Sequence, residues 1–146
     1  MTTRTGWIET YRGRVTPAEC DYLGHMNIQF YVARISDATA ALNNAIGFTA
    51  GYVRSQRRAL VTVHQDITYI AEVIAGDLLV MHSGVSGAES KKVRVLHRLT
   101  RAGSDEPVMT ANVLMVAMDL ERRRAAAIDE AILAGMGKRL IGDPGS

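Results

Sequence analysis

The sequence predicts an α+β fold in which one long helix packs against an antiparallel sheet and is partly enclosed by it. Two observations support this prediction. Apolar residues recur at three- and four-residue steps over one long stretch that begins at Ile28, which is the period of an amphipathic helix. One segment with strand character precedes this helix and four follow it, joined by short turns. Short turns indicate antiparallel neighbours, because parallel neighbours need long crossovers.

Composition and length narrow the class of protein. The chain has 146 residues, 47% of them hydrophobic and 22% charged, which predicts one globular domain over 1–146, with its core at about 7–128 and a helical tail at 129–146. A net charge of +2 is too small to indicate nucleic-acid binding. Neither a secretory signal nor a membrane-spanning run is visible, and the single cysteine, Cys20, excludes an internal disulfide. We therefore expect a cytoplasmic protein that binds neither membranes nor nucleic acid.

The ends of the first strand and of the long helix have clear signals. The strand is expected over 7–15 and should end before Pro17, which has no amide to donate to a ladder. The helix should begin after Asn27, a good N-cap, and end at Gly47, which tolerates a left-handed backbone. Its second face is also partly apolar, with Ala33, Ala40 and Ala41, which favours a sheet that wraps around it.

The second half of the chain reads as a run of strands. We expect an irregular polar connection over 50–59, hairpin loops at 86–90 and 102–107, a weaker helix at 126–140 and a loose tail at 142–146. The four strands are expected at 60–71, 78–85, 92–101 and 108–120. A sheet of five strands leaves unpaired edges, and self-association as a dimer or tetramer would cover them.

The loop before the helix contains several residues of types that act in catalysis. Asp21, Gly24, His25 and Asn27 lie within seven residues, directly before the first amide of the helix, that of Ile28. The first amides of a helix have no intrahelical acceptor and favour negative charge. A carboxylate that faces such amides suits acyl transfer, because it can attack or activate water while the amides stabilise an oxyanion. The residues alone leave a second interpretation open: an Asp before a helix is usually a turn or cap residue, Asn27 can be a simple cap, and His25 can be structural.

The order of these residues resembles a known family. The pattern Asp21-x-x-Gly24-His25-x-Asn27-x-x-x-Tyr31 is similar to that of the hotdog-fold acyl-CoA thioesterases, in the 4-hydroxybenzoyl-CoA thioesterase-like branch. The resemblance covers about residues 7 to 128 and includes the segments 67–69, 76–77 and 116–119. It implies a hotdog fold with a five-stranded sheet around the central helix, a dimer with active sites at the subunit interface, and hydrolysis of an acyl-CoA to a free acid and coenzyme A.

The same resemblance assigns roles to residues. Asp21 matches the catalytic carboxylate, as nucleophile or general base, and the backbone amide of Ile28 matches the group that polarises the thioester carbonyl. Gly24 and His25 match the loop that shapes the site. Asn27 and Tyr31 belong to the same motif and are expected among the substrate-binding residues. Asn27 should mainly present the Ile28 amide, and Tyr31 can also be structural. No metal or other cofactor is implied, since coenzyme A enters as part of the substrate.

The phosphates of coenzyme A call for basic residues at the mouth of the pocket. Lys91, Lys92 and Arg94 resemble the place where relatives bind these phosphates, and Arg57 with Arg58 is a second possibility. The densest basic run is 122–124. Each run can also be a solvated surface segment.

Two departures from the family pattern leave details open. Family members often carry a second Asn where this chain has Ile28, which leaves the contacts to the acyl group undefined. Many also have a proline soon after the position of Tyr69, and here the chain continues as Ile70-Ala71-Glu72. The sequence does not identify the acyl group.

Other activities are less well supported. A hotdog hydratase or dehydratase usually has its histidine five positions after the aspartate, whereas Asp21 and His25 are four apart. A non-catalytic acyl-binding protein is the third possibility. The segment 84–87 falls one residue short of the Gly-x-Ser-x-Gly motif of serine hydrolases, and the Cys and His spacing does not indicate a metal site.

Overall fold

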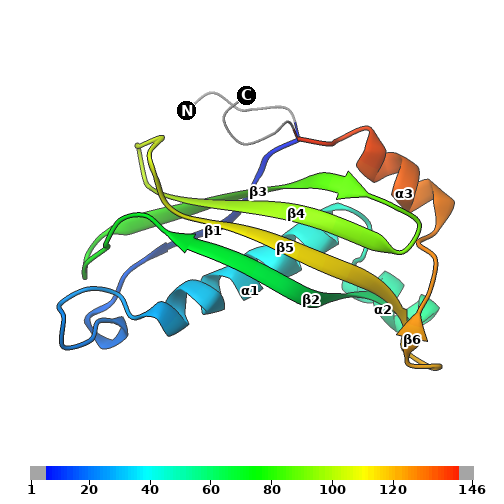
Figure 1. Cartoon of the computed structure of the whole chain (residues 1–146), viewed down its shortest axis with the longest axis horizontal. Coiled ribbons are helices and arrows are strands. Elements are labelled where there is room, and N and C mark those ends of the chain that lie inside the picture. Colours follow the sequence, from blue (N-terminus) through cyan, green and yellow to red (C-terminus); the bar gives the residue numbers. More distant parts are fainter. Residues whose placement is uncertain (1–5, 142–146) are drawn as a thin grey trace.

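The computed structural model describes residues 6–141 and has the predicted α+β architecture (Figure 1). One long helix runs beneath an antiparallel sheet, and two short helices lie near one end of the molecule. In chain order the elements are β1 (Ile8–Arg14), the 3-10 turn η1 (Pro17–Glu19), α1 (Ile28–Ala45), α2 (Ala50–Gln56), β2 (Arg58–Tyr69), β3 (Leu78–Ala88), β4 (Lys92–Arg101), β5 (Pro107–Asp119), β6 (Arg124–Ala125) and α3 (Glu130–Gly137).

The sheet has the strand order β1-β3-β4-β5-β2, and every neighbouring pair is antiparallel. The strand before the helix and the strand after it therefore form opposite edges. The apolar side of α1 faces the sheet through Tyr31, Ile35, Ala38 and Leu42, all of them buried. This is the hotdog arrangement expected from the sequence, and the predicted fold class is confirmed.

The core lies between α1 and the sheet. Its largest fully buried side chains include several methionines together with Leu79 and Leu99. These largest side chains also include the polar His97 on β4, whose ring is hydrogen-bonded to Ser83 at 2.6 Å through Nδ1 and to Thr39 of α1 at 3.2 Å through Nε2. Burial lowers the pKa of His97 to about 4, so the ring sits neutral between sheet and helix.

Both predicted ends of α1 are confirmed. The Asn27 side chain accepts a hydrogen bond from the Gln29 amide at 3.1 Å, which is the N-cap contact. Gly47 follows the last turn with φ +120°, a backbone conformation that side chains disfavour.

Several sequence expectations are wrong or need new boundaries. The stretch 50–59 is not irregular, because Thr49 caps α2 by accepting the Tyr52 amide at 3.1 Å, and Arg57 ends the helix with φ 54°. β3 continues to Ala88, into the loop expected at 86–90, and β2 ends at Tyr69. The short β6 adds a sixth strand to the five expected. The helix expected over 126–140 is limited to α3, and the tail expected at 142–146 lies outside the described residues.

No helix within residues 6–141 has the length and apolar character needed to cross a membrane.

Candidate active site

The loop from η1 to α1 is a tight turn held by its own backbone. The Asp21 amide donates to the His25 carbonyl at 3.1 Å, and the Gly24 amide donates to the Asp21 carbonyl at 2.9 Å. Gly24 has φ +87°, which residues with a side chain rarely adopt. An antiparallel β-bridge between the backbones of Cys20 and Met26 closes the base of the turn. The loop therefore presents Asp21 and His25 from a compact backbone.

A buried ion pair anchors this loop to α1. Glu19 at the end of η1 pairs with Arg34 of α1, and the Glu19 carboxylate also accepts the Thr16 amide at 2.9 Å. Burial raises the pKa of Glu19, but the bonds from Thr16 and the charge of Arg34 outweigh it and hold the pKa below its usual value. The Glu19 carbonyl in turn accepts the Asn27 amide at 2.9 Å. Loop and helix start therefore form one unit.

The Asp21 carboxylate is hydrogen-bonded on both oxygens. Oδ2 accepts from the Asn27 side-chain amide at 2.9 Å, and Oδ1 accepts from the Leu23 backbone amide at 2.9 Å. These bonds, that of Asn27 first, lower the pKa of Asp21 below its ordinary value. The carboxylate is therefore ionised at neutral pH, as a nucleophile or general base must be.

The Ile28 amide opens α1. The Asn27 side chain caps Gln29, and the Phe30 amide donates to the Asn27 carbonyl at 3.0 Å, whereas the Ile28 N–H has no acceptor within residues 6–141. This amide lies at the positive end of the helix dipole and is available to an oxygen of a ligand.

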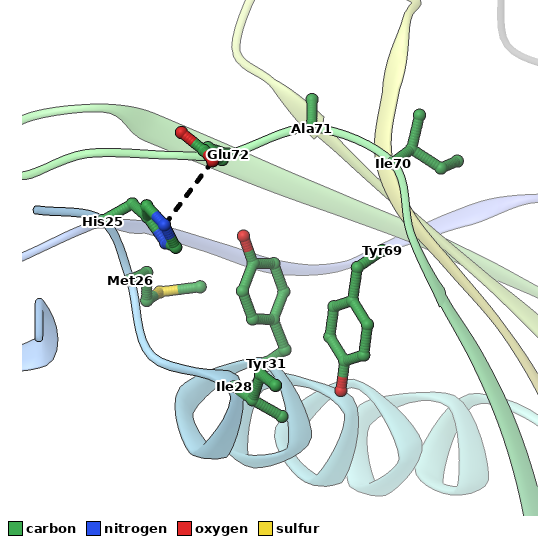
Figure 2. A pocket seen from close by; sticks show the side chains of 8 residues that line it. All are labelled: His25, Met26, Ile28, Tyr31, Tyr69, Ile70, Ala71 and Glu72. Carbon is green, nitrogen blue, oxygen red and sulfur yellow. Dashed lines mark ion pairs between the residues drawn. The ribbon is translucent and has the colours of Figure 1, made fainter. Parts of the chain in front are cut away.

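A pocket of about 310 Å³ lies beside the Ile28 side chain (Figure 2). Tyr31 from α1 and Tyr69 from the end of β2 stand with ring centroids 5.2 Å apart and planes 78° apart. His25 Nε2 lies 3.5 Å from Glu72 Oε1 across the pocket, and the Tyr31 hydroxyl points toward this pair in Figure 2. The pocket is lined by His25, Met26, Ile28, Tyr31, Tyr69, Ile70, Ala71 and Glu72.

The pocket brings together some of the predicted site residues and adds others. His25, Ile28 and Tyr31 line it, while Asp21, Gly24 and Asn27 belong to the adjoining loop and are not part of the lining. Sequence reasoning missed Tyr69 and Glu72 as site residues. The departure from the family pattern after Tyr69 could have pointed to them. The segment that departs, 70–72, forms the wall of the pocket opposite α1.

The basic residues expected to bind phosphate lie far from this pocket within one chain. Arg58 opens β2, whereas Tyr69 of the pocket ends it, and a strand of twelve residues spans roughly 35–40 Å. Lys92 is the first residue of β4 and lies at the same end of the sheet as Arg58, because Lys92 pairs with Val116 and Arg58 with Asp119 near the end of β5. Lys91 precedes Lys92 at this end. Arg58 is paired there with Asp119 at 3.0 Å. Arg94 is also on β4 and outside the pocket lining.

Across residues 6–141, no group of three or more His, Cys, Asp or Glu side chains is placed to hold a metal ion. Cys20 is half-buried, with its thiol 3.7 Å from the Thr16 carbonyl oxygen.

Comparison with known proteins places the chain in a family. The model of the thioesterase-like superfamily matches residues 15–136, so the chain belongs to this superfamily. The betainyl-CoA thioesterase of Pseudomonas aeruginosa is 26% identical over 127 residues, which is 87% of this chain and 80% of that protein. The L-carnitine dehydrogenase/betainyl-CoA thioesterase of Agrobacterium fabrum is 29% identical over 129 residues, and the chain spans only 26% of its length.

A solved structure has the same fold. A hypothetical protein of Staphylococcus aureus, determined in complex with CoA, superposes with a TM-score of 0.87 over 100% of this chain and 93% of the other, at 19% identity. The family model confirms the predicted family, and this structural match confirms the hotdog fold. The relatives named as thioesterases support the predicted class of thioester hydrolases.

Proposed function

We propose that this protein hydrolyses acyl-CoA thioesters to a free acid and coenzyme A, with Asp21 as the catalytic carboxylate. The observation that carries the proposal is the arrangement at the start of α1. An ionised carboxylate, held by Asn27, precedes a helix whose first amide has no acceptor within residues 6–141, and a pocket opens beside that amide. Membership in the thioesterase-like superfamily and the relatives named as thioesterases support the same reaction.

The reaction follows from these groups. The thioester carbonyl accepts a hydrogen bond from the Ile28 amide, which polarises the carbonyl carbon. Asp21 then attacks this carbon and forms a mixed anhydride that water cleaves, or it takes a proton from a water molecule that attacks instead. In both routes the C–S bond breaks, the sulfur leaves as thiolate and is protonated, and the acid is released. One donor to the developing oxyanion is typically worth about 10²–10³ in rate.

The experiment compares the wild type with Asp21→Asn and a control, Asp105→Asn, which changes an exposed residue. Thiol release from a panel of saturated acyl-CoAs is followed with a thiol reagent, and hydration of enoyl-CoAs is measured in parallel. We expect Asp21→Asn to lower kcat by about 10²–10⁴, with no change in Asp105→Asn. Full activity in Asp21→Asn contradicts the mechanism. Turnover of enoyl-CoAs alone indicates a hydratase, and binding without turnover indicates a non-catalytic acyl-binding protein.

We further propose that the working unit contains at least two copies joined along β2. Within residues 6–141, this strand pairs only with β5, and residues 62–66 are exposed along its free edge. Antiparallel pairing with the same strand of a second copy, centred on this segment, would set Arg58 of one copy beside Tyr69 of the other. The basic residues at the start of β2 and β4 would then reach the phosphates of a CoA molecule bound in the pocket of the neighbouring copy.

The motif at Asp21 leaves the acyl group open. The relatives named for betainyl-CoA act on the thioester of a quaternary ammonium acid, so a charged aliphatic acyl group is one possible substrate of this chain. The residues that line the pocket determine whether it favours such a group or a neutral acyl group.

A further inference from the structure

Two tyrosines form a corner in the pocket beside Ile28. The planes of Tyr31 and Tyr69 are 78° apart and their centroids 5.2 Å apart, so the two rings make adjoining walls rather than a stack. Tyr31 is buried on α1, whereas Tyr69 is partly exposed at the end of β2. The faces of aromatic rings are negative, and a corner of two rings is an arrangement that attracts an alkylated ammonium group.

The charges around this corner favour a cation as well. Glu72 places a carboxylate at the pocket, with its Oε1 3.5 Å from His25 Nε2. None of the residues within 6–141 that line the pocket is a Lys or an Arg. Arg101 lies outside the lining, where it donates to the Glu72 carbonyl and pairs with the Asp77 carboxylate at 3.5 Å, which offsets part of the positive charge that Tyr31 experiences.

The remaining walls suit methyl groups rather than hydrogen-bond donors. Met26, Ile28, Ile70 and Ala71 supply apolar surface. A volume of about 310 Å³ is at the small end of the range for ligand pockets, which fits a short acyl group. Tyr31, Tyr69 and Glu72 provide a negative electrostatic environment within this small apolar space.

We infer that the pocket selects thioesters whose acyl group ends in a small alkylated cation, of which trimethylammonioacetyl is the simplest case. Tyr31 and Tyr69 contact the cationic head through their ring faces, and the Glu72 carboxylate balances its charge. The short acyl chain leaves the carbonyl at the Ile28 amide. This inference rests on the proposed hydrolysis of acyl-CoA, but recognition of the cation itself does not require turnover.

The test uses two substrates of the same shape, one cationic and one neutral. Because the ammonium group also makes the thioester carbonyl more electrophilic, the ratio of their kcat/KM values is compared between the wild type and its variants. Trimethylammonioacetyl-CoA carries a quaternary nitrogen where 3,3-dimethylbutanoyl-CoA carries a quaternary carbon. We expect kcat/KM of the wild type to favour the cationic substrate by about tenfold. Tyr69→Leu and Glu72→Gln should each remove most of this preference, measured as the ratio of kcat/KM for the two substrates in the same variant. The matched control Glu106→Gln removes an exposed carboxylate on the hairpin between β4 and β5 and should leave the preference unchanged.

The outcomes separate the acyl specificity from the hydrolase activity. Hydrolysis of both substrates at equal kcat/KM, or a preference for the neutral one, overturns the cation site and leaves the proposed function intact. If neither substrate is hydrolysed, the proposed function fails for this acyl class. Calorimetric titration with the two corresponding thioethers of CoA then tests whether the pocket binds the cation. A tenfold lower Kd for the cationic thioether, lost in Glu72→Gln, supports the site, and equal Kd values overturn it.

Discussion

The side chain of Asn27 joins the Asp21 carboxylate to the first turn of α1. Its Nδ2 donates to Asp21 Oδ2 at 2.9 Å, and its Oδ1 accepts from the Gln29 amide at 3.1 Å. One side chain therefore sets the distance between the carboxylate and the helix start, and it also lowers the pKa of Asp21. Asn27 is a positioning residue in this arrangement rather than a reacting group.

Asn27→Asp should shift the pH dependence of activity. The new carboxylate can still cap Gln29, but it no longer donates to Asp21 and places a second negative charge beside it. The pKa of Asp21 should rise, so the acid limb of kcat/KM for acyl-CoA hydrolysis should move to higher pH by about one unit or more. Asn44→Asp, an exposed change on the same helix, is the control. An acid limb at the wild-type position in Asn27→Asp would show that Asn27 does not tune the carboxylate.

The buried pair of Glu19 and Arg34 should be worth far more than a surface pair. The two side chains are only 11% and 15% exposed, and Arg34 also lies over the Tyr11 ring at 5.1 Å. Arg34→Gln leaves the Glu19 carboxylate buried without its partner, which should lower the free energy of unfolding by about 3–5 kcal/mol.

A double-mutant cycle in urea can measure this coupling. Adding Glu19→Gln to Arg34→Gln should recover part of the loss, since the uncompensated charge is gone. The control is the exposed pair of Arg12 and Glu9, whose side chains are 63% and 44% exposed, and Arg12→Gln should cost less than about 1 kcal/mol. Equal losses for Arg34→Gln and Arg12→Gln would contradict the assigned role of the buried pair.

The parts of the structure that were predicted correctly have local causes. Asn27 and Gly47 mark the ends of α1 through capping and backbone freedom, which act within a few residues. The same signal was present at Thr49 but was missed, because α2 has only seven residues and no apolar periodicity to draw attention to it. Local chemistry therefore predicted the helix that carries the site and passed over the one that does not.

The pocket could not be predicted, because it depends on contacts between distant segments. Tyr31 meets Tyr69 only because β2 ends beside the first turns of α1, and this register is set by pairing along all of β2 and β5. Glu72 entered the sequence analysis only as part of a departure from a family pattern. The position of Arg58 at the far end of β2 likewise follows from strand direction rather than from a motif.

If two copies associate along β2, a charged substitution at Val63 should weaken the dimer. This residue lies at an irregularity in the pairing of β2 with β5 and is 56% exposed at the free edge. The wild type should be at least dimeric by light scattering, and Val63→Glu should shift it toward monomer because it places two carboxylates close to one another across the joined strands. Ile74→Glu is the matched control, since Ile74 is 55% exposed but lies outside β2. A monomeric wild type at working concentration, or equal effects of both changes, would argue against this interface.

His97 should make the fold sensitive to mild acid. Its pKa is lowered from 6.5 to about 4 by burial between Ser83 and Thr39, so the folded protein holds the neutral ring while the unfolded chain binds a proton near pH 6.5. The stabilisation is fully present above pH 6.5 and is lost as the pH falls toward 4. Between pH 7 and pH 5 this amounts to about 2 kcal/mol of unfolding free energy.

The measurement is urea unfolding of the wild type and His97→Gln at pH 7 and pH 5 and at one protein concentration. His97→Gln keeps a polar side chain that can bond to the same hydroxyls, so it should be less stable at pH 7 because of imperfect packing. Its loss of stability between the two pH values should be smaller than that of the wild type by about 2 kcal/mol, because it has no buried imidazole to protonate. The ionised carboxylates with lowered pKa, such as those of Asp21 and Glu19, titrate in both proteins and cancel in this difference. The same pH dependence in both proteins would mean that His97 is already protonated in the folded state at pH 5.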